Sequence, residues 1–173
     1  GRAFLDAGAG VATHVPFSLL AQHSEGLIAL TGGPGGPLDR ALRDGQMDLA
    51  AERLARLKAL FGDRLYVELQ RHGTDEERMV EAELLRLAYR DGLPVVATNE
   101  PFFAKAGDYE AHDALLAIAE GRLVTDDNRR RLTSAHDFKS RAEMVKLFAD
   151  LPEAVEATVE IAMRCAYRPL TRK

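Results

Sequence analysis

Alternation of apolar and polar side chains predicts a β-strand over residues 65–73. Successive side chains of a strand point to opposite sides, so this strand has two different faces. One face consists of Leu65, Val67 and Leu69, and the other carries Tyr66, Glu68, Gln70 and His72. The pattern predicts a strand that packs under helices on its apolar side and presents polar groups on the other.

A second strand is predicted over residues 94–98, where a short apolar run ends in the polar residues Asn99 and Glu100. Polar groups at the carboxyl ends of strands are characteristic of ligand sites in α/β proteins. The edge of the sheet where the two strands end is therefore the candidate functional site.

The segment between these two strands has the signals of a helix. Thr74, followed three residues later by Glu77, forms a capping box, and Gly92 supplies a left-handed stop. The predicted buried stripe consists of Val80, Leu84, Leu87 and Ala88. Strand–helix–strand connections of this kind lay their strands parallel, so the predicted fold class is α/β with a parallel sheet.

The first sixty residues predict further alternating elements. They are a helix over residues 17–23, a strand over 27–31, a glycine-rich turn over 31–36, a short helix from Pro37, and a longer helix with apolar positions Met47, Ala50, Leu54, Leu57 and Phe61. Glycines between a strand and a helix can hold a phosphate. This turn has neither the dinucleotide fingerprint nor a P-loop lysine, which favours a structural turn.

The last third of the chain is predicted to be helical. Helices are expected from Asp108 to Glu120, after Ser140, and after Pro152, with a polar loop over residues 122–133. The inward positions of the final helix are expected to be Val155, Thr158, Ile161, Ala162 and Cys165. Cys165, the single cysteine, is interpreted as a small buried hydrophobic residue.

Composition indicates one globular domain that is not anchored in a membrane. The 173 residues are 46% hydrophobic and 29% charged, and no apolar run reaches the roughly 20 residues of a spanning helix. The first residues lack the blocks of a signal peptide, so a cytoplasmic protein is expected. A net charge of −4 argues against a surface built to wrap a nucleic acid. The basic run over residues 129–131 follows two aspartates and is interpreted as a solvated loop, with contact to DNA or a partner protein as the alternative.

The polar groups at the strand ends leave two interpretations open. Glu68, His72 and Glu100 could converge as ligands for zinc, manganese or iron, because carboxylates and imidazoles suit these metals. Alternatively, Glu68, Gln70 and His72 hydrogen-bond one another and the nearby backbone, as buried polar groups must.

Six segments resemble, in order and with similar gaps, the PHP (polymerase and histidinol phosphatase) domain of bacterial replicative DNA polymerase III alpha subunits. They are GLIALTGGPGG, LYVELQRHG, GLPVVATNEPFF, AHDALLAIAEG, FKSRAEMVKLFADLPEA and TVEIAMRCAYRP. The resemblance implies a distorted seven-stranded β/α barrel, of which residues 1–173 form the later part as a single domain. The earlier barrel strands, and the palm, thumb and fingers with their magnesium, are expected outside this chain.

The resemblance also predicts a degenerate metal site. In metal-competent relatives a cysteine stands at the position of Gly33, an aspartate at that of Glu100 and a histidine at that of Phe102. Gly33 and Phe102 offer no side-chain ligand, so no metal or other cofactor is expected in this segment. Glu68, Gln70 and His72 match the family segment but not its ligand positions.

Two functions follow from the resemblance. The first is a noncatalytic scaffold within the replicative DNA polymerase, which contacts the other regions of the alpha subunit, docks the proofreading exonuclease and meets DNA only through the intact polymerase. The alternative is a metal-dependent phosphoesterase or an intrinsic 3′–5′ exonuclease. The parent protein is expected to be a DNA-directed DNA polymerase, a nucleotidyltransferase, and this segment alone is expected to be inactive.

Overall fold

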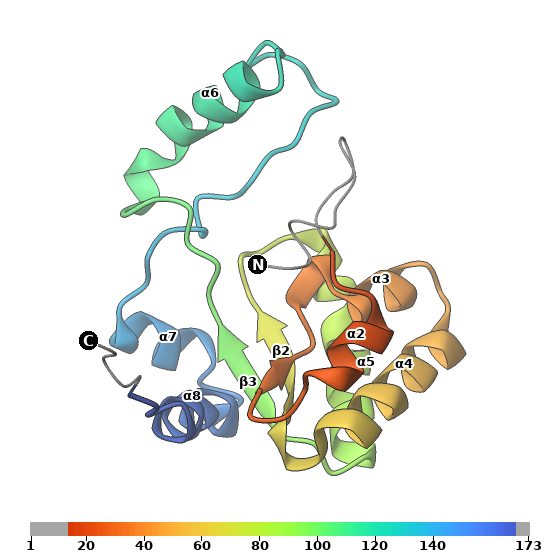
Figure 1. Cartoon of the computed structure of the whole chain (residues 1–173). Coiled ribbons are helices and arrows are strands. Elements are labelled where there is room, and N and C mark those ends of the chain that lie inside the picture. The colour runs from red at the N-terminus through yellow and green to blue at the C-terminus, as the bar shows by residue number, and fades with distance from the viewer. Residues whose placement is uncertain (1–13, 169–173) are drawn as a thin grey trace, which may run out of the picture.

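A parallel three-stranded sheet lies at the centre of the structure, a computed structural model that describes residues 14–168 (Figure 1). The strands β1 (Ala29–Leu30), β2 (Leu65–Gln70) and β3 (Val95–Thr98) are ordered β1-β2-β3. Val67 pairs with Val95 in the parallel register of β2 and β3. The predicted α/β class and parallel pairing are confirmed. Residues 14–168 contribute three strands, so the closed seven-stranded barrel stays a prediction.

Strand β1 is shorter than the predicted segment 27–31. Ala29 pairs with Leu65 and Leu30 with Tyr66, and the Thr31 N–H still donates to the Tyr66 carbonyl at 3.2 Å. The chain then turns away through the 3₁₀ helix η1 (Gly33–Gly35). The glycine-rich segment is therefore a turn that ends the strand.

Within the described residues, four helices precede the strands or connect them. They are α2 (Phe17–Gln22), α3 (Pro37–Arg43), α4 (Met47–Phe61) and α5 (Asp75–Arg90), with the 3₁₀ helix η2 (Gly62–Arg64) leading into β2. Helices α3, α4 and α5 pack against one face of the sheet (Figure 1). The core there contains the predicted strand face Leu65, Val67 and Leu69 and the predicted helix stripe Val80, Leu84, Leu87 and Ala88. Both predictions of burial are confirmed.

Helix α5 begins with the predicted capping box. The Glu77 N–H donates to Thr74 Oγ1, and the Thr74 N–H donates to Glu77 Oε2 at 3.1 Å. Gly92 has the left-handed backbone expected of a stop signal, with φ of 63°. Ser140 and Glu143 form the second predicted capping box, at the start of α7 (Arg141–Leu147).

Helix α8 (Pro152–Arg164) packs along β3, the outer strand of the sheet (Figure 1). Its buried residues are Ala154 and Ala157, whose small side chains allow a close approach. The predicted inward positions are wrong for Thr158, Ala162 and Cys165, which are exposed, and Val155 and Ile161 are partly buried. Apolar side chains occur on two sides of this helix, and spacing alone did not identify the side that meets the sheet.

A second small cluster covers the polar face of the sheet near its amino end. Tyr66 and Val96 are fully buried against Ala157 of α8. The Tyr66 hydroxyl donates to Glu160 Oε1 at 2.7 Å and accepts from Arg164 Nη1 at 2.9 Å. This face is thus apolar under α8 and polar only toward the carboxyl ends of the strands.

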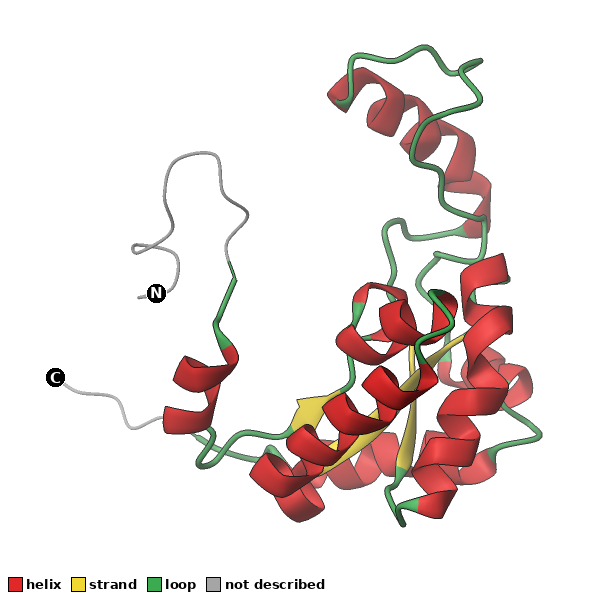
Figure 2. Ribbon diagram, turned by 90° about the vertical axis from the view of Figure 1, so that its right-hand side faces the viewer, coloured by secondary structure: helices red, strands yellow, loops and turns green. Residues whose placement is uncertain are grey.

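Residues 102–138, called the arm below, project away from the sheet (Figures 1 and 2). The arm contains the 3₁₀ helix η3 (Ala106–Asp108), helix α6 (Tyr109–Ala119) and a returning loop. Within residues 14–168 the helices found are too short or too polar to cross a membrane.

Candidate functional site

Glu68 joins the three strands at the carboxyl edge of the sheet. Its Oε2 accepts the Gly32 N–H at 2.9 Å, and its Oε1 accepts the Thr98 hydroxyl at 2.5 Å and Gln70 Nε2 at 3.1 Å. The Glu68 N–H in turn donates to Thr31 Oγ1 at 2.9 Å. Both carboxylate oxygens are therefore used to hold the turn after β1 and the end of β3 against β2.

Gln70 closes the space beside Gly33. A β-carbon at Gly33 would lie 2.8 Å from the Gln70 carboxamide oxygen, and the φ of Gly33 is +54°. Such a distance is too short for an ordinary contact, and the backbone angle is one that glycine adopts without strain. A cysteine at this position would require Gln70 to move.

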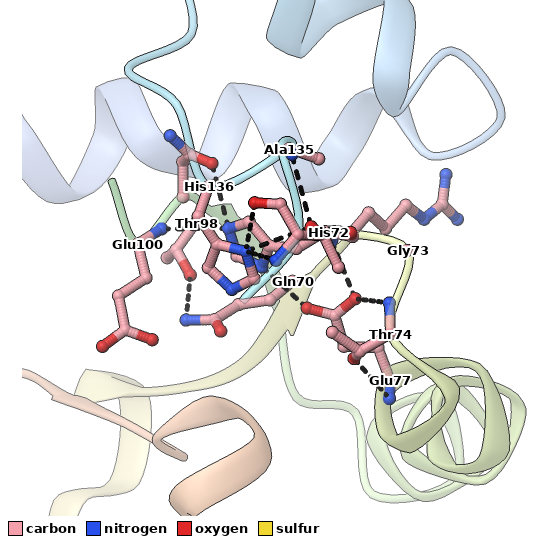
Figure 3. A network of polar contacts seen from close by, with 12 residues as sticks. Gln70, His72, Gly73, Thr74, Glu77, Thr98, Glu100, Ala135 and His136 are labelled. Carbon is pink, nitrogen blue, oxygen red and sulfur yellow. Dashed lines mark hydrogen bonds and ion pairs between the residues drawn. The ribbon is translucent and has the colours of Figure 1, made fainter. Parts of the chain in front are cut away.

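His72 is buried, and both of its ring nitrogens have partners (Figure 3). Nδ1 lies 2.7 Å from Glu77 Oε1, while Nε2 accepts the Glu100 N–H at 3.2 Å and lies 3.1 Å from Asn99 Oδ1. The Glu100 donor leaves Nδ1 as the nitrogen that donates to Glu77. His72 therefore fixes the loop after β3 to the start of α5.

The Glu77 carboxylate is buried, and it accepts hydrogen bonds from His72 and Thr74. Burial alone would raise the pKa of Glu77, but hydrogen bonds from His72 and Thr74 lower this pKa below its usual value. The His72 N–H donates to Glu77 Oε2 at 2.7 Å. Glu77 thus serves both as the predicted capping residue and as the partner of His72.

His136 of the arm stacks on His72, with ring centroids 4.0 Å apart (Figure 3). The Thr133 N–H donates to His136 Nδ1 at 3.2 Å, and the Thr133 hydroxyl donates to the His72 carbonyl at 2.6 Å. Burial lowers the pKa of His136, and the neighbouring His72 lowers it further. The end of β2 and the base of the arm are joined by these contacts.

Phe102 lies among aromatic and basic side chains. Its ring centroid is 5.9 Å from that of His136 and 5.7 Å from that of His112, and the Arg130 guanidinium carbon lies 5.6 Å from it. The exposed Glu100 carboxylate points away from the His72 ring (Figure 3). An aromatic ring packed among these neighbours offers no metal ligand.

The structure does not bring the proposed ligands Glu68, His72 and Glu100 together as one group. Across residues 14–168, no group of three His, Cys, Asp or Glu side chains is placed to hold a metal ion. The alternative interpretation, local hydrogen bonding of Glu68, Gln70 and His72, matches the observed contacts. The sequence did not identify His136 as part of this polar network, because only folding brings it beside His72.

The loop over residues 129–131 is not uniformly solvated, contrary to expectation. The Arg129 side chain is 1% exposed, and its two terminal nitrogens donate to the Asp113 carboxylate at 2.6 Å and 2.5 Å. Arg130 and Arg131 are exposed. The sequence prediction considered only the charges within the loop, so it did not include the pairing of Arg129 with Asp113 on helix α6.

Comparison with known proteins supports the resemblance recognised in the sequence. Residues 2–72 match the PHP domain family. The chain is 50% identical to the DNA polymerase III subunit alpha of Caulobacter vibrioides over 95% of its length, 46% identical to that of Pseudomonas aeruginosa over 82%, and 42% identical to that of Escherichia coli over 84%. It spans only 14%, 12% and 13% of these relatives. Over most of its length the chain is therefore similar to a segment of bacterial DNA polymerase III alpha subunits, and residues 2–72 of it match the PHP domain family.

Proposed function

We propose that the chain is a noncatalytic PHP scaffold within a replicative DNA polymerase of the bacterial cytoplasm. In this function it supports the polymerase core, while magnesium-dependent nucleotide transfer takes place in regions outside the chain. Alpha subunits of three bacteria that match most of the chain support this proposal.

The proposal that the scaffold is noncatalytic is supported by the hydrogen bonds that His72 and Glu68 make within the fold. A catalytic metal needs about three protein ligands and an open position for water or substrate. Both nitrogens of His72 and both oxygens of Glu68 are engaged by other groups of the chain. Gln70 occupies the space beside Gly33, and Phe102 replaces a ligand with a ring.

Elemental analysis of the purified chain tests this part. We expect no stoichiometric zinc, manganese or iron, and no hydrolysis of phosphomonoesters or of DNA 3′ ends when these metals are added. One tightly held metal per chain that disappears in Glu100→Ala but persists in Glu110→Ala would contradict the scaffold. It would favour the metal-dependent phosphoesterase or 3′–5′ exonuclease instead.

We also propose that the scaffold docks the proofreading exonuclease through its surface. Glu68 and His72 are engaged in the fold, whereas Val159 and Met163 on α8 are 58% and 73% exposed. Residues that dominate an interface lose more than about 1 kcal/mol of binding when truncated. Such losses are expected on α8 or at Arg130 and Arg131.

Titration of the exonuclease against the complete alpha subunit measures this docking. A version without this segment should bind more weakly, while Glu68→Gln and His72→Gln should retain affinity once their folding is verified. Equal affinity of the complete and shortened proteins would remove the docking function and leave only support of the polymerase core.

A further inference from the structure

Asp39 lies on the buried side of helix α3, where the other buried residues are apolar. These residues are Leu38, Ala41 and Leu42, and Asp39 itself is 3% exposed. The Asp39 Oδ1 atom has no hydrogen-bond partner among residues 14–168. A buried polar atom without a partner costs about 1–3 kcal/mol, so a core carboxyl group of this kind requires one.

A second buried atom without a partner belongs to the residue one helical turn further along α3. This atom is Arg43 Nε, which has no hydrogen-bond partner within the described part of the chain. The Arg43 side chain is held in place because its Nη2 donates to the Pro34 carbonyl at 3.2 Å. Residues four apart share one side of a helix, and the charge of Arg43 acts on Asp39. One buried acceptor and one buried donor therefore occupy the same side of α3.

A cavity of about 10 Å³ lies beside Asp39, between α3, β2 and α5. Its polar lining includes Asp39, Glu68, Gln70 and Glu77, and Pro34 also lines it. On the same measure, the smallest space that holds one water molecule is about 10–15 Å³. The cavity is therefore at the lower limit for one water and too small for an organic ligand or a hydrated ion.

The two glutamates that line the cavity each have room for one further hydrogen bond. An ionised carboxylate accepts about four hydrogen bonds. The contacts described above supply three to Glu68 and three to Glu77. About one acceptor position therefore remains on each, and a water beside Asp39 can donate to either glutamate.

The chemistry of Asp39 favours water over a cation as the occupant. Burial is the main cause that raises the pKa of Asp39 to about 7, the charges of Glu68 and Glu77 raise it further, and Arg43 opposes the shift. Protonated and ionised forms are therefore both populated near neutral pH. A water accepts from the protonated carboxyl group and donates to the ionised one, whereas a cation suits only the ionised form. The positive charge of Arg43 also repels a cation.

We propose that this cavity is a binding site for a single water molecule, which links Asp39 of α3 to Glu68 of β2 and Glu77 of α5. The water satisfies the buried carboxyl group in either protonation state and connects α3 to the polar network at the strand ends. This inference requires neither membership in an alpha subunit nor a metal or a partner protein.

Oxygen-17 magnetic relaxation dispersion of the chain tests the proposal, because its amplitude counts the water molecules that stay bound for a long time. The comparison is between wild type and Asp39→Leu, which removes the polar partner and fills the cavity with apolar atoms that exclude water. Asp44→Leu makes the same change at the exposed end of α3 and is the control. Asp39→Leu should lose the amplitude of one water, while Asp44→Leu should keep that of wild type.

Two outcomes of this comparison contradict the proposal. Equal amplitudes in wild type and Asp39→Leu would show that no long-lived water depends on Asp39. An equal loss in Asp44→Leu would show that the lost water does not belong to the cavity. Either result would overturn the assignment of this site.

High-resolution crystallography of the wild-type chain provides a second measurement if Asp39→Leu folds poorly. A water should lie about 2.5–3.0 Å from Asp39 Oδ1 and from an oxygen of Glu68 or Glu77. Crystals grown in rubidium chloride separate water from a cation, because rubidium gives an anomalous signal and water does not. An anomalous peak in the cavity, or a cavity without electron density, would overturn the proposal.

Discussion

The imidazole rings of His72 and His136 stack almost parallel, with 4.0 Å between their centroids and 12° between their planes. His72 follows the end of β2, whereas His136 lies at the base of the arm, where its carbonyl accepts the Phe102 N–H. Both histidines are buried. The stack therefore connects the arm to the sheet and makes the position of α6 depend on the polar network at the strand ends.

His136→Ala should release the arm without unfolding the sheet. The substitution removes the ring stacked on His72 and leaves the Thr133 N–H without its acceptor. We expect a loss of about 1–2 kcal/mol in the free energy of unfolding. Amides of α6 should exchange faster, while those of β2 should change little. Ser134→Ala, an exposed neighbour, is the control, and equal exchange in both variants would contradict this function of His136.

The elements that the sequence predicted well are those governed by local rules. The capping boxes at Thr74 and Ser140 lie where their spacing placed them, because a cap and its partner are three residues apart. The parallel pairing of β2 and β3 follows from the helix that connects them. The inward face of α8 was not predictable in the same way, because the helix has apolar side chains on two sides and only the sheet selects Ala154 and Ala157.

The stability of the chain should depend on pH through Asp39 of α3. This carboxyl group is 3% exposed, and its Oδ1 has no hydrogen-bond partner. Burial is the main cause that raises the pKa of Asp39 to about 7, with the charge of Glu68 raising it further and that of Arg43 opposing the shift. In the unfolded chain the group ionises near its ordinary value of 3.8.

Asp39→Asn removes this dependence and provides the measurement. Between about pH 4 and pH 7 the folded state holds more protons at Asp39 than the unfolded state, so a rise in pH favours unfolding. The asparagine variant should therefore gain stability relative to wild type by about 2 kcal/mol from about pH 5 to about pH 8, after allowance for solvent screening. Denaturant titrations at several pH values measure the difference. A difference that does not change with pH would contradict a buried, protonated Asp39.

The pair Asp113 and Arg129 should keep the arm closed. Asp113→Asn removes the charge that the two Arg129 nitrogens contact, so the returning loop should detach from α6. The hydrogen bond from Arg129 lowers the pKa of Asp113, so acid should weaken the same contact only at pH values below the ordinary range of an aspartate.

Limited proteolysis over residues 122–131 measures whether the loop has detached. Faster cleavage is expected in Asp113→Asn, partial protection in the exchanged pair Asp113→Arg/Arg129→Asp, and unchanged cleavage in Glu110→Gln. Equal cleavage in all three would exclude a contribution of the pair.

Glu68 and His72 of the candidate site could be predicted from the sequence, but His136 could not. Glu68 and His72 were identified because alternation places them on one side of a strand that ends at an edge of the sheet. Their partners Thr98 and Asn99 come from the neighbouring strand end, which the parallel pairing brings alongside. His136 gave no sequence signal, since the arm that carries it has no regular spacing relative to β2.

Two adjacent glycines after β1 should respond very differently to the same substitution. A β-carbon at Gly36 would lie 2.3 Å from the Thr31 carbonyl oxygen, a backbone atom that cannot rotate away, whereas a β-carbon at Gly35 has no atom within 4 Å. Gly36→Ala must therefore displace the turn that Glu68 holds through the Gly32 N–H.

We expect Gly36→Ala to lower the free energy of unfolding by about 2–4 kcal/mol, and Gly35→Ala to stay within about 0.5 kcal/mol of wild type. Thermal or denaturant unfolding of the two variants side by side measures this. If both variants match wild type, the turn does not approach β1 as closely as the structure has it.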